Sequence, residues 1–147
     1  MSLFLSTFEN KIDLKGRVSL PSSFREVLSD NEKQSIVLYE SSINQCIEGC
    51  GILRIEEIST RIDDLDPFST EKDAFASVVL GGSVKLDFDK DGRILLPKHL
   101  TTFAKIDASA VFIGKGQIFE IWNGKLLEKH LERAREEIKK NREVFKK

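Results

Sequence analysis

The strongest constraint on the fold is an internal repeat. Residues 13–28 read DLKGRVSLPSSFREVL and residues 89–104 read DKDGRILLPKHLTTFA, with five identical positions among the sixteen. About one identity is expected by chance from average residue usage. Two copies are too few for a solenoid, which needs at least three repeats to bury its faces. We therefore expect the two halves of the chain to complete one core together. The identical pairs are Asp13 and Asp89, Gly16 and Gly92, Arg17 and Arg93, Leu20 and Leu96, and Pro21 and Pro97.

Each copy predicts a hairpin followed by a short helix. An alternating apolar segment leads into the motif, and the glycine permits a turn with positive φ before the returning strand. The proline suits the first turn of a helix, because it has no N–H to donate to a central ladder. We expect one or two helical turns there and then two further strands in each half. The expected strands are residues 8–13, 18–20, 35–39 and 46–48 in the first half, and 84–89, 94–96, 110–113 and 118–122 in the second.

Three longer helices are expected outside the repeats. Apolar residues recur at helical spacing in 52–65, and Asp66-Pro67 should end that helix. A capping box at 70–73 predicts a second helix that runs to Gly81-Gly82. Residues 125–147 form an amphipathic segment with nine Lys or Arg and five Asp or Glu, a net charge of +4. Its apolar stripe packs either on its own domain or on a neighbouring subunit.

Composition describes one folded domain of ordinary size. The chain has 147 residues, 40% of them hydrophobic, and its 23 Lys and Arg against 24 Asp and Glu give a net charge of -1. No apolar run approaches the roughly 20 residues that a transmembrane helix needs, and the start lacks a secretory pattern, so we expect a cytoplasmic protein that does not contact membranes. Cys46 and Cys50 are interpreted as buried or half-buried thiols, because no second pair of ligands accompanies them as a zinc site requires.

The repeated Asp-x-x-Gly-Arg sequence is the candidate functional motif. An aspartate at the start of a turn accepts hydrogen bonds from backbone N–H groups two or three residues later, and it can also hold the arginine. The simplest interpretation is that Asp13 and Asp89 only brace their turns. Repetition favours a further role, since Arg17 and Arg93 side by side form a local positive surface for phosphates or guanine edges.

Three stretches resemble a known family. FENKIDLKGRVSLP at 8–21, LDFDKDGRILLP at 86–97 and GKGQIFEIWN at 114–123 are similar to the MraZ family of bacterial transcriptional regulators. The resemblance extends from about Phe4 to the C-terminal helix. It implies a mainly β, α+β fold with two pseudo-symmetric AbrB-like swapped-hairpin halves. These halves would close a small β-barrel with peripheral helices and a C-terminal amphipathic helix.

The expected boundaries follow from this resemblance. Residues 5–54 are the first AbrB-like repeat, 55–82 the connecting helices, 83–124 the second repeat and 125–147 the C-terminal helix. The resemblance also implies a homo-oligomeric ring, association with the nucleoid, and binding to short direct repeats in double-stranded promoter DNA. That promoter would lie ahead of the division and cell wall gene cluster, and occlusion of polymerase would make the protein a repressor.

The motif carries over onto both turns of this chain. We expect Arg17 to read a guanine or clamp a phosphate, Lys15 to contact a phosphate, and Asp13 to orient Arg17. Lys90 and Arg93 are either a weaker copy or a purely structural pair, and the weaker copy is favoured because Asp91 replaces Lys15. Gly16 and Gly92, with Asp89, brace the turns.

Two other classes of function compete with DNA binding. The long amphipathic C-terminal segment also fits an antitoxin-like protein-interaction module, in which DNA contact is incidental. An enzyme is disfavoured, because neither turn has a nucleophile, a metal cluster or an acid/base pair beside it. We therefore predict no catalytic residue, no metal, no cofactor and no small-molecule ligand.

Overall fold

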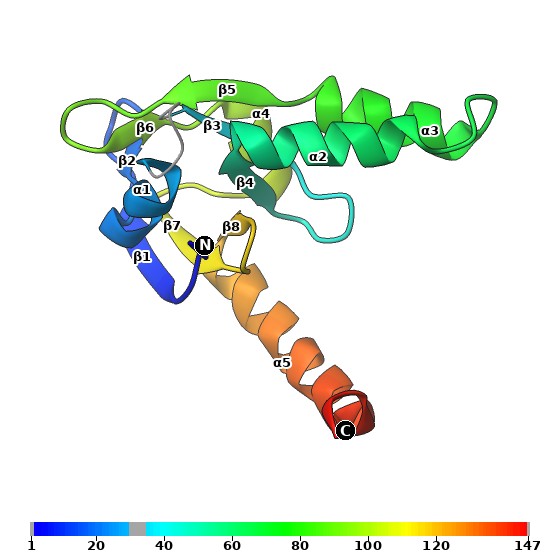
Figure 1. The fold of residues 1–147 in the computed structure, drawn as a ribbon. Coiled ribbons are helices and arrows are strands. Elements are labelled where there is room, and N and C mark those ends of the chain that lie inside the picture. Colours follow the sequence, from blue (N-terminus) through cyan, green and yellow to red (C-terminus); the bar gives the residue numbers. More distant parts are fainter. Residues whose placement is uncertain (1, 30–34, 147) are drawn as a thin grey trace.

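The computed structural model describes residues 2–29 and 35–146, and the same order of elements occurs twice along the chain (Figure 1). Each half contains two strands, a short helix and two more strands. The first half comprises β1 (Thr7–Lys11), β2 (Arg17–Ser19), α1 (Ser22–Ser29), β3 (Ser35–Glu40) and β4 (Ile47–Gly51). The second comprises β5 (Val84–Asp87), β6 (Arg93–Leu95), α4 (Lys98–Ala104), β7 (Ser109–Gly114) and β8 (Phe119–Trp122). The glycine turns and both short helices of the repeat are thus confirmed. The predicted hairpins are wrong, because β1 pairs with β7 and β5 with β3, while β2 and β6 pair with each other across the two halves.

The strands of the two halves interlock. A six-stranded antiparallel sheet has the order β1-β7-β8-β4-β3-β5, so each edge strand pairs with a strand from the other half of the chain. The short strands β2 and β6 pair with each other in a separate two-stranded ladder. The fold is therefore mixed α+β with antiparallel sheets.

The expected closed barrel is wrong. No strand pairing among the described residues joins the edge strand β5 back to the edge strand β1. Closure would need strands that pair on both sides, whereas β2 and β6 are three residues long and pair only with each other. The sheet consequently stays open, and the β2–β6 ladder covers one of its faces.

The main core lies between that face and the ladder. Val18 of β2 and Ile94 of β6 are both 1% exposed and point inward. Phe24 of α1 is fully buried, and its ring centroid lies 5.2 Å from those of Phe4 and Phe119. Burial of such rings removes a large apolar area from water and adds edge-to-face contacts. Residues from both halves thus share one core, as the repeat predicted.

The second face of the sheet is covered by helices at two places. At one end, α2 (Ile52–Asp63), α3 (Thr70–Phe75) and the π-helical segment η1 (Ala76–Leu80) form a projection whose apolar residues pack on β3 and β4. At the other end, α5 (Gly124–Lys140) packs on β7 and β8 through buried Leu127. His130 stacks on Trp122, with ring centroids 4.8 Å apart. The first turns of α5 therefore belong to this domain.

Several helix ends differ from the expectation. Ser69 caps α3, because its hydroxyl accepts a hydrogen bond from the Lys72 N–H, so the expected capping box begins one residue too late. The C-terminal helix ends at Lys140 and does not continue to 147, which lies outside the described residues. The Asn141 side chain donates to the Glu137 carbonyl at 2.8 Å, and this local bond replaces further helix. A 3-10 turn, η2 (Arg142–Phe145), follows.

Two sequence interpretations concern the interior and the membrane. Cys46 and Cys50 are buried, free thiols, and burial raises the pKa of the Cys50 thiol to about 12. The interpretation of both as buried thiols is confirmed. Within residues 2–29 and 35–146, none of the helices is both long enough and apolar enough to cross a bilayer.

Candidate nucleic-acid interface

The first turn is held by the Asp13 carboxylate. Its Oδ1 accepts hydrogen bonds from the backbone N–H groups of Lys15, at 2.9 Å, and Arg17, at 2.8 Å. Its Oδ2 accepts one from the Arg17 Nε at 2.8 Å, which makes a charge-assisted pair. The Gly16 N–H closes the turn on the Asp13 carbonyl at 3.0 Å. One side chain thus fixes both the backbone of the turn and the direction of the arginine.

The second turn repeats this geometry. Asp89 Oδ1 accepts from the N–H groups of Asp91 and Arg93, both at 2.9 Å, and Oδ2 accepts from the Arg93 Nε at 3.1 Å. The turn glycines, Gly16 and Gly92, have φ values of +84° and +76°. Residues with a Cβ rarely adopt this left-handed conformation, which explains why glycine stands at both positions.

The two turns are coupled through the β2–β6 ladder. Arg17 pairs with Leu95 and Ser19 pairs with Arg93, so these side chains share the face of the ladder opposite the buried Val18 and Ile94. Diagonal neighbours on such a pair lie about 7–8 Å apart. The ladder therefore presents both arginines side by side on its outer face, as the sequence predicted.

The turn glycines also bind the opposite repeat. The Leu20 N–H donates to the Gly92 carbonyl at 2.9 Å, and the Leu96 N–H donates to the Gly16 carbonyl at 3.1 Å. Each turn is thus anchored on the other half of the chain. These two hydrogen bonds therefore tie both turns to the ends of the ladder that carries the arginines.

The electrostatics differ between the two turns. Backbone hydrogen bonds from Arg17 and Arg93 hold the pKa values of Asp13 and Asp89 below the 3.8 usual for an aspartate, so both are carboxylates at neutral pH. Arg17 uses only Nε on Asp13, and its terminal Nη1 and Nη2 have no partner among the described residues. Arg93 also gives an Nη2 hydrogen bond to Asp91 at 3.3 Å. The first turn consequently offers the freer guanidinium.

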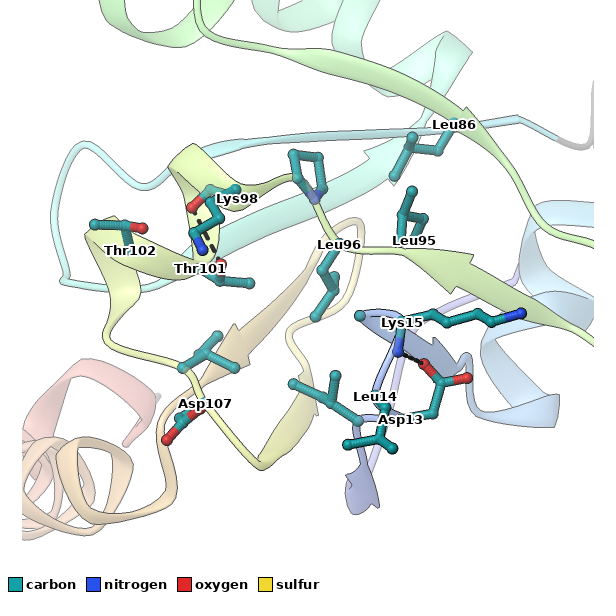
Figure 2. A pocket seen from close by; sticks show the side chains of 14 residues that line it. Asp13, Leu14, Lys15, Leu86, Leu95, Leu96, Lys98, Thr101, Thr102 and Asp107 are labelled. Atoms are coloured by element: carbon teal, nitrogen blue, oxygen red, sulfur yellow. Dashed lines mark hydrogen bonds between the residues drawn. The ribbon is translucent and has the colours of Figure 1, made fainter.

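A groove runs beside the first turn (Figure 2). It has a volume of about 720 Å³ and lies between the first turn, the end of β6 and helix α4. Lys98 and Thr101 line it from α4, and Leu95 lines it from β6. Figure 2 shows the Lys15 side chain extending from the turn, away from Lys98 and Thr101. The groove is thus lined by one lysine on each side, Lys15 on the first turn and Lys98 on α4.

The structure adds two cations that the motif did not predict. The Arg25 guanidinium of α1 lies against the second turn, and a Cβ on Gly92 would come within 2.5 Å of its Nη1. Lys98, at the start of α4, shares the groove with Lys15. Their sequence signal is a position on the helix that follows the shared proline, four residues after Pro21 for Arg25 and one residue after Pro97 for Lys98. Only the paired ladder brings Arg25 of one repeat to the turn of the other.

Comparison with known proteins identifies the family. The family model described as "MraZ protein, putative antitoxin-like" matches residues 79–146. The transcriptional regulator MraZ of Rickettsia akari (strain Hartford) is 46% identical over 134 residues, which cover 91% of this chain and 90% of that protein. The chain belongs to the MraZ family. Its resemblance to MraZ, inferred from three sequence stretches, is confirmed.

The MraZ relatives span both turns. The transcriptional regulator MraZ of Pelagibacter ubique (strain HTCC1062) is 46% identical over 144 residues, which cover 98% of this chain and 93% of that protein. The MraZ family model itself covers the second turn and α5. The likeness to MraZ therefore includes the part of the chain that carries Asp13 and Arg17.

Proposed function

We propose that this chain is a sequence-specific, DNA-binding transcriptional regulator that acts as a repressor. The observation that carries the proposal is the pair of braced arginines, Arg17 and Arg93, on one exposed face of the β2–β6 ladder. Planar guanidinium groups of this kind bind phosphates and guanine edges through two hydrogen bonds. Relatives named transcriptional regulators support the same function.

Each side chain of the first turn has a role in this proposal. Arg17 directs its free Nη1 and Nη2 to a guanine or a phosphate, and Lys15 contacts a phosphate. Asp13 orients Arg17 through the 2.8 Å contact to Nε. Gly16 allows the turn that brings these groups together.

The second turn is the weaker copy. Arg93 and Lys90 contact DNA on the same face, but Asp91 takes part of the hydrogen-bonding capacity of Arg93 and adds a negative charge. Asp89 and Gly92 brace this turn as Asp13 and Gly16 brace the first. The positive charge of Arg25, which lies against Gly92, offsets part of the negative charge of the second turn.

We propose that the chain has a double AbrB-like fold. Residues 5–54 and 83–124 would be the two pseudo-symmetric repeats, with 55–82 as connecting helices and 125–147 as the C-terminal segment. The repeated order of elements and the exchange of edge strands between the halves support it.

Tight binding would come from several copies acting at once. One turn with two or three phosphate contacts binds weakly, whereas a homo-oligomeric ring can engage short direct repeats simultaneously. We propose such repeats in the promoter of the division and cell wall gene cluster, with occlusion of polymerase as the means of repression. The protein would act in the cytoplasm on the nucleoid, without cofactor or small-molecule ligand.

A titration with promoter DNA tests the function. The wild-type chain, Arg17→Ala and Lys15→Ala are compared at moderate salt on a fragment that carries direct repeats from upstream of the gene itself. Greatly weakened binding of both variants, with an unchanged circular dichroism spectrum and native mass, is expected. Unaltered affinity would reject the assignment of the first turn.

An antitoxin-like protein-interaction module is the second candidate. The exposed distal part of α5 and the description of the family model favour it. Deletion of 136–147 retains the packed residues Leu127 and Leu131 and therefore leaves the domain intact. A DNA-binding regulator keeps the DNA contacts of its first turn after this deletion, whereas a pure interaction module shows no specific DNA affinity before or after it.

A further inference from the structure

Two parts of the chain project from the body of the protein with opposite charge. Figure 1 shows α2 and α3 leaving one end of the sheet and α5 leaving the other, with their free ends apart. The segment 52–75 contains three Lys or Arg and seven Asp or Glu, a net charge of -4. The segment 125–147 has a net charge of +4. Such complementary surfaces attract each other when they belong to different copies.

The distal part of α5 exposes apolar side chains. Ile138 is 65% exposed, and Phe145 in η2 is 92% exposed. Ile138 continues the stripe that begins with Leu127 and Leu131, which pack on the sheet. Phe145 lies beyond the end of the helix, in η2. Neighbouring apolar residues on one exposed element mark an interaction site more often than isolated ones do.

An apolar groove lies on the other projection. We call it the α2 groove, and it has a volume of about 420 Å³ between α2, the end of α3 and the β3–β4 loop. Ile43 and Phe75 line it and remain 85% and 40% exposed. This volume falls within the range that accommodates bound apolar groups.

The α2 groove also contains unsatisfied polar atoms. Tyr39 is 2% exposed, and its hydroxyl has no hydrogen-bond partner in the described part of the chain. The buried Nε of Arg54 is likewise without a partner there. Both residues line the groove. Buried polar groups are almost always paired, so these two atoms mark the α2 groove as a surface that is incomplete on its own.

The end of α5 in the same chain does not reach the α2 groove. Leu127 and the stack of His130 on Trp122 fix the first turns of α5 on β7 and β8. From there the helix runs away from α2, as Figure 1 shows. The occupant of the α2 groove must therefore come from another molecule.

We propose that the end of α5 together with η2, residues 138–145, in one copy docks in the α2 groove of the next copy. Ile138 and Phe145 would cover Ile43 and Phe75, while the basic segment meets the acidic projection. Donor and acceptor are different surfaces, so the contact is heterologous, and such contacts form a ring when the rotation closes. This inference rests on the proposed ring and names the surfaces that build it.

Complementation between two disabled variants tests the docking. Ile138→Ser/Phe145→Ser removes the donor and keeps the groove, whereas Ile43→Ser/Phe75→Ser removes the groove and keeps the donor. By native mass spectrometry, each variant alone should be monomeric. A one-to-one mixture should form dimers and nothing larger, because only one intact contact remains. This recovery also shows that both variants are folded.

A matched control lies on the same helix. Leu53 of α2 is 58% exposed but does not line the groove, so Leu53→Ser should assemble as the wild type does. The wild-type assembly should also weaken as salt is raised, because opposite charges at exposed surfaces are screened.

Other outcomes overturn the docking in distinguishable ways. Variants that assemble like a multimeric wild type, or that fail to form dimers when mixed, would refute this contact and leave the DNA proposal standing. A monomeric wild type would refute both the ring and the docking. If the donor variant loses DNA affinity at unchanged mass, the distal helix binds DNA and not a second copy.

Discussion

Arg17 and Arg93 lie on one face of the β2–β6 ladder, Arg17 opposite Leu95 and Arg93 opposite Ser19. Each is held by an aspartate four residues earlier, through contacts of 2.8 and 3.1 Å to Nε. Among residues 2–29 and 35–146, Arg93 has a second acidic neighbour, Asp91, and Arg17 has none. This difference between otherwise equivalent turns predicts unequal contributions to DNA binding.

Replacing Arg17 with Lys should weaken specific DNA binding by roughly 5- to 150-fold, equivalent to about 1–3 kcal/mol, because the charge remains but the planar fork is lost. Arg93→Lys should weaken specific DNA binding less than Arg17→Lys does. Fluorescence anisotropy with a specific fragment and a scrambled one measures both. An equal loss on the two fragments would show that Arg17 clamps a phosphate and does not read a base.

Lys15→Ala should lower the slope of log affinity against log salt by about 0.9, because one phosphate contact and its counterion release are lost. The loss of affinity should be similar for specific and scrambled DNA. Lys85→Ala, an exposed lysine of β5, is the control and should leave the slope unchanged. An unchanged slope in Lys15→Ala would contradict the phosphate contact.

Alanine at the turn glycines should reduce the free energy of unfolding by about 1–2 kcal/mol, since each adopts a left-handed backbone. Gly116→Ala isolates this cost, because its φ is +86° and no atom lies within 4 Å of the added Cβ. Gly16→Ala should lower the free energy of unfolding by the same amount as Gly116→Ala. Gly92→Ala should additionally displace Arg25 and weaken DNA binding. Urea unfolding measures the first effect, and a loss limited to Gly92→Ala would contradict the backbone argument.

The carboxyl groups of Asp13 and Asp89 should titrate below pH 3.8 in the folded protein, because backbone hydrogen bonds stabilise the charged form. A pKa that is lower in the folded state contributes stability above the ordinary aspartate pKa and loses it as pH falls through the folded pKa. The difference in stability between wild type and Asp13→Asn should therefore shrink towards low pH. Carbon-detected NMR gives the midpoints, and values at or above 3.8 would rule out this bracing.

Phe24→Ala should destabilise the fold by about 3–5 kcal/mol, because it leaves a cavity where residues of both halves meet. Phe68 is 95% exposed, so Phe68→Ala should change stability by no more than about 0.5 kcal/mol. Chemical denaturation compares the two. Equal effects would show that the core is not centred on Phe24.

Local features of this fold could be predicted because their causes are local. Asp13 can reach the N–H groups of its own turn, and glycine at position 16 permits the left-handed backbone, whatever the rest of the chain does. Both glycine turns and the helices after Pro21 and Pro97 followed from the same residues. The predicted pairing across each turn was wrong, because the strands on either side pair with strands of the other half. The helix ends at 69 and 141 were missed, since side chains of Ser and Asn compete locally for backbone groups.

Pairing between distant strands decided whether the sheet closes into a barrel, which the sequence pattern could not predict. A swapped-hairpin pattern is compatible with a closed barrel or an open sheet. Because β2 and β6 pair with each other and not with β1 or β5, these two strands stay at the edges of the larger sheet. The same pairing placed Arg25 of the first repeat on Gly92 of the second.

The sequence by itself determined that two equivalent turns each carry an aspartate-braced arginine, because that geometry depends on residues four positions apart. Tertiary structure decided that Arg17 and Arg93 face the same side and that the end of α5 leaves the domain. It also left the terminal amino groups of Arg17 without a partner in the described part of the chain. These relationships depend on strand register and packing between distant segments, which no local pattern encodes.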